Sequence, residues 1–104
     1  MQPRPAPSAP AAPADLETVK TLTATDVKYG IITFGAKFHV GFGVPVTVEV
    51  NGTEYSAKTH GSTKGRVDGV KRMLAEQGLQ EGDMVRASYD ARAQVIRLDP
   101  IRVE

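Results

Sequence analysis

Apolar and polar residues alternate on both sides of the dipeptide Asn51-Gly52. The flanking segments, residues 46–50 and 53–58, are rich in valine, threonine and tyrosine, whose branched or aromatic side chains favour strands. An Asn-Gly pair readily takes the left-handed backbone conformation of a type I′ turn, which joins two antiparallel strands. The pattern therefore predicts a β-hairpin over residues 46–58.

The short loop of this hairpin also predicts its register. It pairs Val50 with Thr53, Val48 with Tyr55 and Val46 with Ala57, which gives the hairpin one apolar face. The same register sets Glu49 opposite Glu54. Because like charges that face each other across two strands are unfavourable, we expect these carboxylates in solvent or beside a basic neighbour.

A second hairpin is predicted near the C-terminus. Its strands are expected at residues 84–89 and 94–98, around the turn Asp90-Ala91-Arg92-Ala93. Pro100 has no backbone N–H group, so we expect it to limit how far a central strand continues.

Further strands are expected in the N-terminal half. Residues 15–26 allow either a frayed helical turn or a strand, and we favour a strand near residues 18–24. Residues 27–34 are crowded with β-branched and aromatic side chains and end at Gly35, so they predict a strand. Residues 38–44 alternate large apolar residues with histidine and glycine, which predicts a strand with one nearly bare face.

Between the two hairpins, apolar residues recur at helical spacing, at Val67, Val70, Met73 and Leu74. Asp68 is the expected N-cap, and Gly78 stands where a left-handed residue ends a helix. Leu79 is expected to fold back onto the apolar face, and the turn Glu81-Gly82-Asp83 to lead into the next strand. This interval predicts one short helix near residues 68–77.

Together these elements predict a mainly β fold class. We expect a small closed or nearly closed (pseudo)barrel of about six strands with one short α-helix, since closure removes exposed strand edges. Residues 15–104 are assigned to this single domain. Residues 1–14 consist mostly of proline and alanine and predict a disordered tail or linker, with a proline-rich ligand for a partner domain as the alternative.

Composition narrows the class further. The chain has 104 residues, no cysteine and a formal net charge of +1. This length predicts one small domain, which depends on an apolar core because no disulfide can support it. The absence of cysteine fits a reducing, cytoplasmic location. No stretch approaches the roughly 20 apolar residues of a membrane-spanning helix, so no membrane partner is expected.

Candidate catalytic groups are few. There is no cysteine nucleophile, and a serine–histidine–carboxylate set arises only by free choice among scattered residues. Two histidines without ligand spacing do not predict a zinc site. The segment Gly61-Ser62-Thr63-Lys64-Gly65 lacks the spacing of a P-loop. We expect no enzymatic activity, no metal and no cofactor.

Positive charge is concentrated between residues 58 and 72, where the only acid is Asp68. The glycine, serine and threonine residues of this segment leave backbone N–H groups that suit phosphate oxygens. An ordinary solvated surface loop is the alternative. The candidate nucleic-acid-binding residues are Lys58, His60, Lys64, Arg66, Lys71 and Arg72, with Lys37 and His39 as a second arm.

These residues carry a family resemblance. Thr63-Lys64-Gly65-Arg66-Val67, a helix-forming interval, Gly78-Leu79-Gln80-Glu81-Gly82-Asp83-Met84-Val85 and a closing hairpin resemble the AbrB-type (SpoVT-AbrB, MazE-like) DNA-binding domain over about residues 63–100. The chain departs from that family at Gly69-Val70, where an Ile-Pro pair is usual. It also places a full set of strands before the motif, which makes it more similar to related cradle-loop barrels, including B3-like pseudobarrel domains. The resemblance implies binding of double-stranded DNA, with Lys64 and Arg66 contacting the DNA backbone.

A second resemblance concerns residues 34–44, which are similar to the Lys-Gly-Phe-Gly-Phe strand of cold-shock domains. In those domains aromatic faces stack on single-stranded bases. The alternative is that Phe38 and Phe42 belong to the core.

We therefore predict a non-catalytic, regulatory nucleic-acid-binding barrel whose partner is duplex DNA. The alternatives left open are a protein interaction or assembly module and a cold-shock-like binder of single strands. A homodimer, and a protein partner bound through the N-terminal tail, are the other partners considered.

Overall fold

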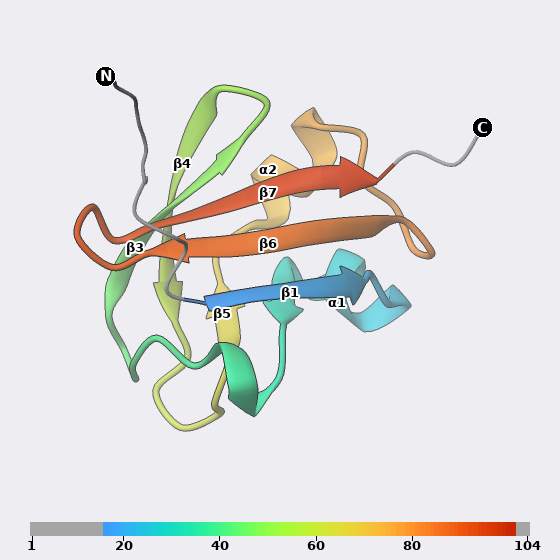
Figure 1. The fold of residues 1–104 in the computed structure, drawn as a ribbon. Helices are drawn as coiled ribbons and strands as arrows, with labels where there is room; N and C mark the ends of the chain where they lie inside the picture. Colours follow the sequence, from blue (N-terminus) through green and yellow to red (C-terminus); the bar gives the residue numbers. More distant parts are fainter. Residues whose placement is uncertain (1–15, 102–104) are drawn as a thin grey trace, which may run out of the picture.

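The computed structural model describes residues 16–101, which form one curled sheet with short helices packed on it (Figure 1). The strands are β1 (Leu16–Thr21), β2 (Ile31–Thr33), β3 (Pro45–Val50), β4 (Thr53–Thr59), β5 (Arg66–Asp68), β6 (Met84–Asp90) and β7 (Val95–Ile101). The helices are α1 (Ala24–Tyr29), α2 (Lys71–Glu76) and the single-turn 3₁₀ helix η1 (Ala36–Phe38). The predicted mainly β class is confirmed, with one strand and one α-helix more than expected.

The strand order is β1-β6-β7-β3-β4-β5-β2, and every neighbouring pair is antiparallel except β3 with β7. The sheet curls into a half-barrel whose two edge strands are β1 and β2. Its concave side holds the core, to which every strand and both α-helical regions contribute apolar side chains. The predicted (pseudo)barrel is therefore present as a half-barrel.

The hairpin of β3 and β4 has the predicted register. Val48 pairs with Tyr55, and the turn residues Asn51 and Gly52 have φ angles of 51° and 83°, the left-handed values that a type I′ turn requires. Glu49 and Glu54 face each other in this register, as predicted. The expected basic neighbour is Arg97, whose Nε donates to Glu49 Oε1 at 3.0 Å.

The second predicted hairpin, β6 with β7, is confirmed and is longer than expected. Its strand β7 continues through Pro100, which pairs in register with Val85. The ladder between β7 and β3 ends at Leu98. Pro100 lies beyond the part of β7 that pairs with β3. A proline is tolerated there because β3 accepts no backbone hydrogen bond from that position.

The predicted strand over residues 27–34 is wrong in its first half. Helix α1 occupies that part, and only Ile31–Thr33 is extended. A reciprocal cap outweighs the β-branched composition: the Thr23 hydroxyl accepts from the Asp26 N–H at 3.1 Å, and the Asp26 carboxylate accepts from the Thr23 N–H at 3.0 Å. Gly30, with a φ of 69°, then ends the helix.

The predicted strand over residues 38–44 is also wrong. Helix η1 ends at Phe38, and the rest of the segment is a loop that contains Gly41 and Gly43 at φ angles of 131° and 64°. Positive φ angles at alternate residues interrupt an extended strand. The two phenylalanines that the predicted strand places on one face also differ in environment, because Phe38 is buried whereas Phe42 keeps 47% of its surface exposed.

Helix α2 is shorter than predicted, and its N-cap is Val70. Asp68 instead belongs to strand β5, where it pairs with Ile31 and Lys58, so its predicted role as N-cap is wrong. The predicted end of the helix is confirmed. Gly78 is left-handed, and the N–H groups of Gly78 and Leu79 donate to the carbonyls of Ala75 and Leu74, which is a Schellman motif.

Within residues 16–101, no helix is long and apolar enough to cross a membrane. The proline- and alanine-rich residues 1–14 lie outside the described part of the chain, and so does Asp15. The predicted tail, its alternative as a proline-rich ligand and the cytoplasmic location stay predictions.

Candidate nucleic-acid interface

Two loops lie side by side at one end of the half-barrel, at the bottom of Figure 1. We define the basic loop as residues 59–66, between β4 and β5, and the glycine-rich loop as residues 35–44, between β2 and β3. Four hydrogen bonds tie them and their flanks together: Phe34 N–H to the Gly65 carbonyl (2.7 Å), Gly43 N–H to the His60 carbonyl (3.3 Å), Thr59 N–H to the Val44 carbonyl (2.9 Å) and Val44 N–H to the Thr59 hydroxyl (2.7 Å). The loops therefore form one surface.

Two glycine backbones approach each other closely where the loops meet. Gly65 is buried at a φ of 72°, and a Cβ atom placed on it would overlap the carbonyl group of Gly35. A left-handed conformation and this approach both require glycine at position 65. Thus the Lys64-Gly65-Arg66 part of the motif holds the basic loop against its neighbour.

His60 organises the turn of the basic loop. Its Nδ1 atom accepts backbone N–H groups from Ser62 (3.1 Å) and Thr63 (2.9 Å). Because two donors point at Nδ1, the hydrogen of the neutral ring resides on Nε2, which stays available as a donor. The histidine thus shapes the loop through one nitrogen and offers the other to a ligand.

The lysines around these loops have no acidic partner in the described part of the chain. Lys37, Lys58 and Lys64 are exposed, and none of them forms an ion pair with residues 16–101. Arg66 is different, because its Nε donates to Asp68 Oδ1 at 2.8 Å on the outer side of β5. The surface presents three free ammonium groups and one partly neutralised guanidinium.

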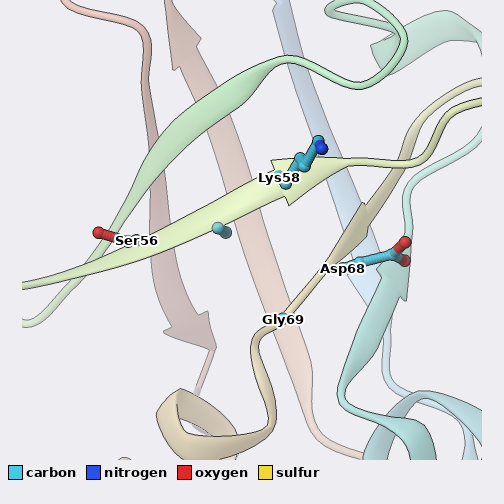
Figure 2. Close-up of a pocket in the computed structure, with 5 residues that line it drawn as sticks. Ser56, Lys58, Asp68 and Gly69 are labelled. Atoms are coloured by element: carbon cyan, nitrogen blue, oxygen red, sulfur yellow. The ribbon is translucent and has the colours of Figure 1, made fainter.

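An open depression of about 300 Å³ lies between β4 and β5, where their pairing ends. It is lined by Ser56, Ala57, Lys58, Asp68 and Gly69. Figure 2 shows the Lys58 and Asp68 side chains extending in different directions, although the two residues pair in register. Among residues 16–101, Lys58 thus has no ion-pair partner, and the Asp68 carboxylate beside it already accepts from Arg66.

The structure separates Lys71 and Arg72 from the other candidate residues. Both lie in α2, which follows the opposite end of β5 from the basic loop. Arg72 Nε donates to Glu76 Oε2 at 2.7 Å, and Glu76 also accepts from the Tyr55 hydroxyl at 2.9 Å. The hydrogen bond from Arg72, followed by that from Tyr55, lowers the pKa of Glu76, and the same contact with Glu76 raises the pKa of Arg72.

His39, the other residue of the predicted second arm, lies in the glycine-rich loop. Its ring packs on Phe42 with centroids 4.4 Å apart, and its buried Nδ1 atom has no hydrogen-bond partner among residues 16–101. In the sequence, Phe42 was marked out only by the resemblance of residues 34–44 to cold-shock domains. Its position between two glycines is the signal that marks a loop tip.

Among residues 16–101, no cluster of three or more histidine, aspartate or glutamate side chains is placed to hold a metal ion. The groups that this surface offers to a ligand are its charges, hydrogen-bonding groups and exposed rings.

No protein-family model and no curated protein sequence matches this chain. One solved structure, the Arabidopsis FUS3–DNA complex, contains a chain similar to it, with a TM-score of 0.64 and 16% sequence identity. The similarity covers 84% of this chain and 97% of that one, which is a B3 DNA-binding domain with a half-barrel fold. At this identity the likeness establishes a shared fold. The AbrB-type half of the predicted resemblance stays a prediction.

Proposed function

We propose that this protein binds double-stranded DNA, without catalysis, through the surface formed by the basic loop and the glycine-rich loop. The carrying observation is that three exposed lysines, Lys37, Lys58 and Lys64, surround two loops tied edge to edge and have no acidic partner among the described residues. The half-barrel shared with the DNA-complexed FUS3 chain supports the same function.

The chemistry of the side chains in this surface assigns some of them to phosphates and others to base edges. Ammonium groups on flexible side chains suit phosphate oxygens, whose contacts position a protein on the duplex without reading sequence. His60 Nε2 and the ring of Phe42 lie in the same surface and are the groups suited to base edges. A module of this kind acts by occupying its site on DNA, which fits a regulatory role.

Arg66 contributes less charge than its position in the sequence indicates, because Asp68 neutralises part of it. Lys71 and Arg72 lie outside the proposed surface, and Arg72 is paired with Glu76. We therefore propose that Lys37, Lys58 and Lys64 supply most of the phosphate contacts. Three such contacts predict a slope of about −3 for log affinity against log salt concentration.

The test is a titration of a random-sequence duplex with the full chain at several salt concentrations, followed by fluorescence anisotropy. Lys64→Ala should weaken binding and make the salt slope about one unit shallower, since one phosphate contact is lost. Arg86→Ala is the matched control, because Arg86 is an exposed cation on β6, outside the proposed surface. Arg86→Ala should show nearly the same salt slope as the wild-type protein.

Equal effects of the two substitutions would show that binding responds only to overall charge and would refute the proposed surface. Absence of duplex binding at low salt would refute the function itself. Preferential binding of a single strand of equal length would favour the cold-shock-like alternative instead.

A further inference from the structure

An aromatic ring is exposed within the proposed DNA-binding surface. The large apolar side chains that are exposed in residues 16–101 are Val19, Tyr29, Phe42 and Met84. Of these, only Phe42 belongs to the glycine-rich or the basic loop. Phe42 keeps 47% of its surface exposed and has no role in phosphate binding, so it is available for an apolar contact with a ligand of this surface.

The Phe42 ring is held in position by its neighbours. The His39 ring packs on it at a centroid separation of 4.4 Å with an interplanar angle of 53°. On the C-terminal side, the N–H of Gly43 donates to the carbonyl of His60, which anchors the loop tip to the basic loop. On the other side, a Cβ atom on Gly41 would approach Val44 Cγ2 to 2.8 Å, so the backbone there is closely packed. Phe42 thus extends from a constrained loop.

This geometry limits how the ring can meet a base. Insertion between base pairs requires an apolar side chain that projects far enough to wedge between two neighbouring bases. The histidine ring covers part of Phe42, which leaves the remainder for lateral contact. In the grooves of duplex DNA, the apolar group on the base edges is the C5 methyl of thymine, which faces the major groove.

We propose that Phe42, supported by His39, contacts thymine methyl groups in the major groove and gives the protein a preference for thymine-containing duplexes. This inference rests on the duplex-binding function proposed above. In this arrangement the lysines bind phosphates on either side, Phe42 supplies an apolar base contact, and His39 positions the ring.

The experiment compares two probes that differ in one methyl group per base pair. One is a duplex of alternating deoxyadenosine and thymidine, and the other has deoxyuridine at every thymidine. The wild-type chain should bind the thymine duplex about fourfold more tightly, the ratio expected for burying one methyl group. Phe42→Ala should bind both duplexes equally, whereas Phe42→Leu should keep part of the preference.

Tyr29→Ala is the matched control, because Tyr29 is an exposed aromatic residue at the end of α1, outside both loops. It should keep the wild-type preference. Thermal unfolding of each variant checks that the fold is intact, and partial retention by Phe42→Leu distinguishes loss of the contact from loss of the loop.

The outcomes separate this inference from the proposed function. Equal binding of both duplexes by the wild-type chain, or an unchanged preference in Phe42→Ala, would overturn the thymine contact and leave duplex binding in place. Binding of neither duplex at low salt would overturn both. A rise in the fluorescence of 2-aminopurine placed in the thymine duplex would indicate an unstacked base, and insertion would replace the lateral contact proposed here.

Discussion

The basic loop and helix α2 begin from similar sequence and end with different surfaces. The positively charged interval from residue 58 to residue 72 contains the basic loop and ends in the first turn of α2, and β5 connects the two regions. In the basic loop, Lys64 is exposed without an acidic partner among the described residues. In α2, Arg72 is equally exposed, but Glu76 lies one turn away and holds its guanidinium at 2.7 Å.

The two regions also differ in what stabilises them. The basic loop is held by backbone contacts, namely those of Gly65 with the glycine-rich loop and those of Ser62 and Thr63 with His60. Helix α2 is held by buried Met73 and Leu74 and by surface bonds among side chains. Charge density in a sequence therefore does not locate a binding surface, because a charge that is already paired offers less to a ligand.

The largest expected effect comes from breaking the backbone contact of the basic loop. Gly65→Ala should lower the free energy of unfolding by about 3 kcal/mol, since it forces a left-handed alanine and an overlap with Gly35. Gly61→Ala is the matched control in the same loop, because a Cβ atom there meets nothing within 4 Å and its φ is not left-handed. Chemical denaturation measures both. Equal stability of the two variants would show that the loops are not closely packed.

A smaller effect is expected from the turn at His60. His60→Ala removes the acceptor of the Ser62 and Thr63 N–H groups, so the amide hydrogens of both residues should exchange several-fold faster with solvent. His60→Asn should restore much of the protection, because an asparagine side chain also accepts the N–H two residues ahead. Hydrogen exchange followed by NMR measures this. Unchanged exchange in His60→Ala would contradict the role of the ring nitrogen.

The smallest effect concerns the ion pair of α2. The pKa of Glu76 is lowered in the folded state from its ordinary value of 4.5, chiefly by the hydrogen bond from Arg72. Its contribution to stability is therefore present above that value and is lost as the pH falls through the lowered pKa. Glu76→Gln should reduce the melting temperature slightly at pH 7, and the reduction should shrink as the pH falls through the lowered pKa of Glu76. The pair is exposed, so solvent screening keeps the difference small.

Glu81→Gln provides the comparison for this measurement, because Glu81 is an exposed acid without an ion pair in residues 16–101. It should show no such pH dependence. If both substitutions behaved alike, the Arg72–Glu76 contact would not be the cause.

The sequence predicted best those elements whose determinants are local. Asn51-Gly52 specified the turn and register of the first hairpin, and Gly78-Leu79 specified the end of α2. Each of these features depends on left-handed residues within a single backbone turn, which neighbouring residues in the sequence determine. It predicted less well where a local cap competes with composition. The Thr23–Asp26 cap produced α1 inside an interval rich in β-branched residues.

The candidate site was only partly predictable for a related reason. Lys58 and Lys64 were named from charge alone, but whether a lysine is free depends on which acids lie near it in space. Phe38 and Phe42 stand four residues apart in similar surroundings, and only the fold decides that one is buried and the other exposed. The pairing of the glycine-rich loop with the basic loop joins residues 15 or more positions apart, which no sequence periodicity reports.

By itself, then, the sequence determined a mainly β chain with two hairpins, a capped helix end and a basic interval, because turns, strand periodicity and charge are written in neighbouring residues. The tertiary structure decided which of those charges stay unpaired, which phenylalanine reaches the surface and which loops share it. These properties depend on the curling of the sheet, which brings β2, β4 and β5 together and carries the loops between them to one end.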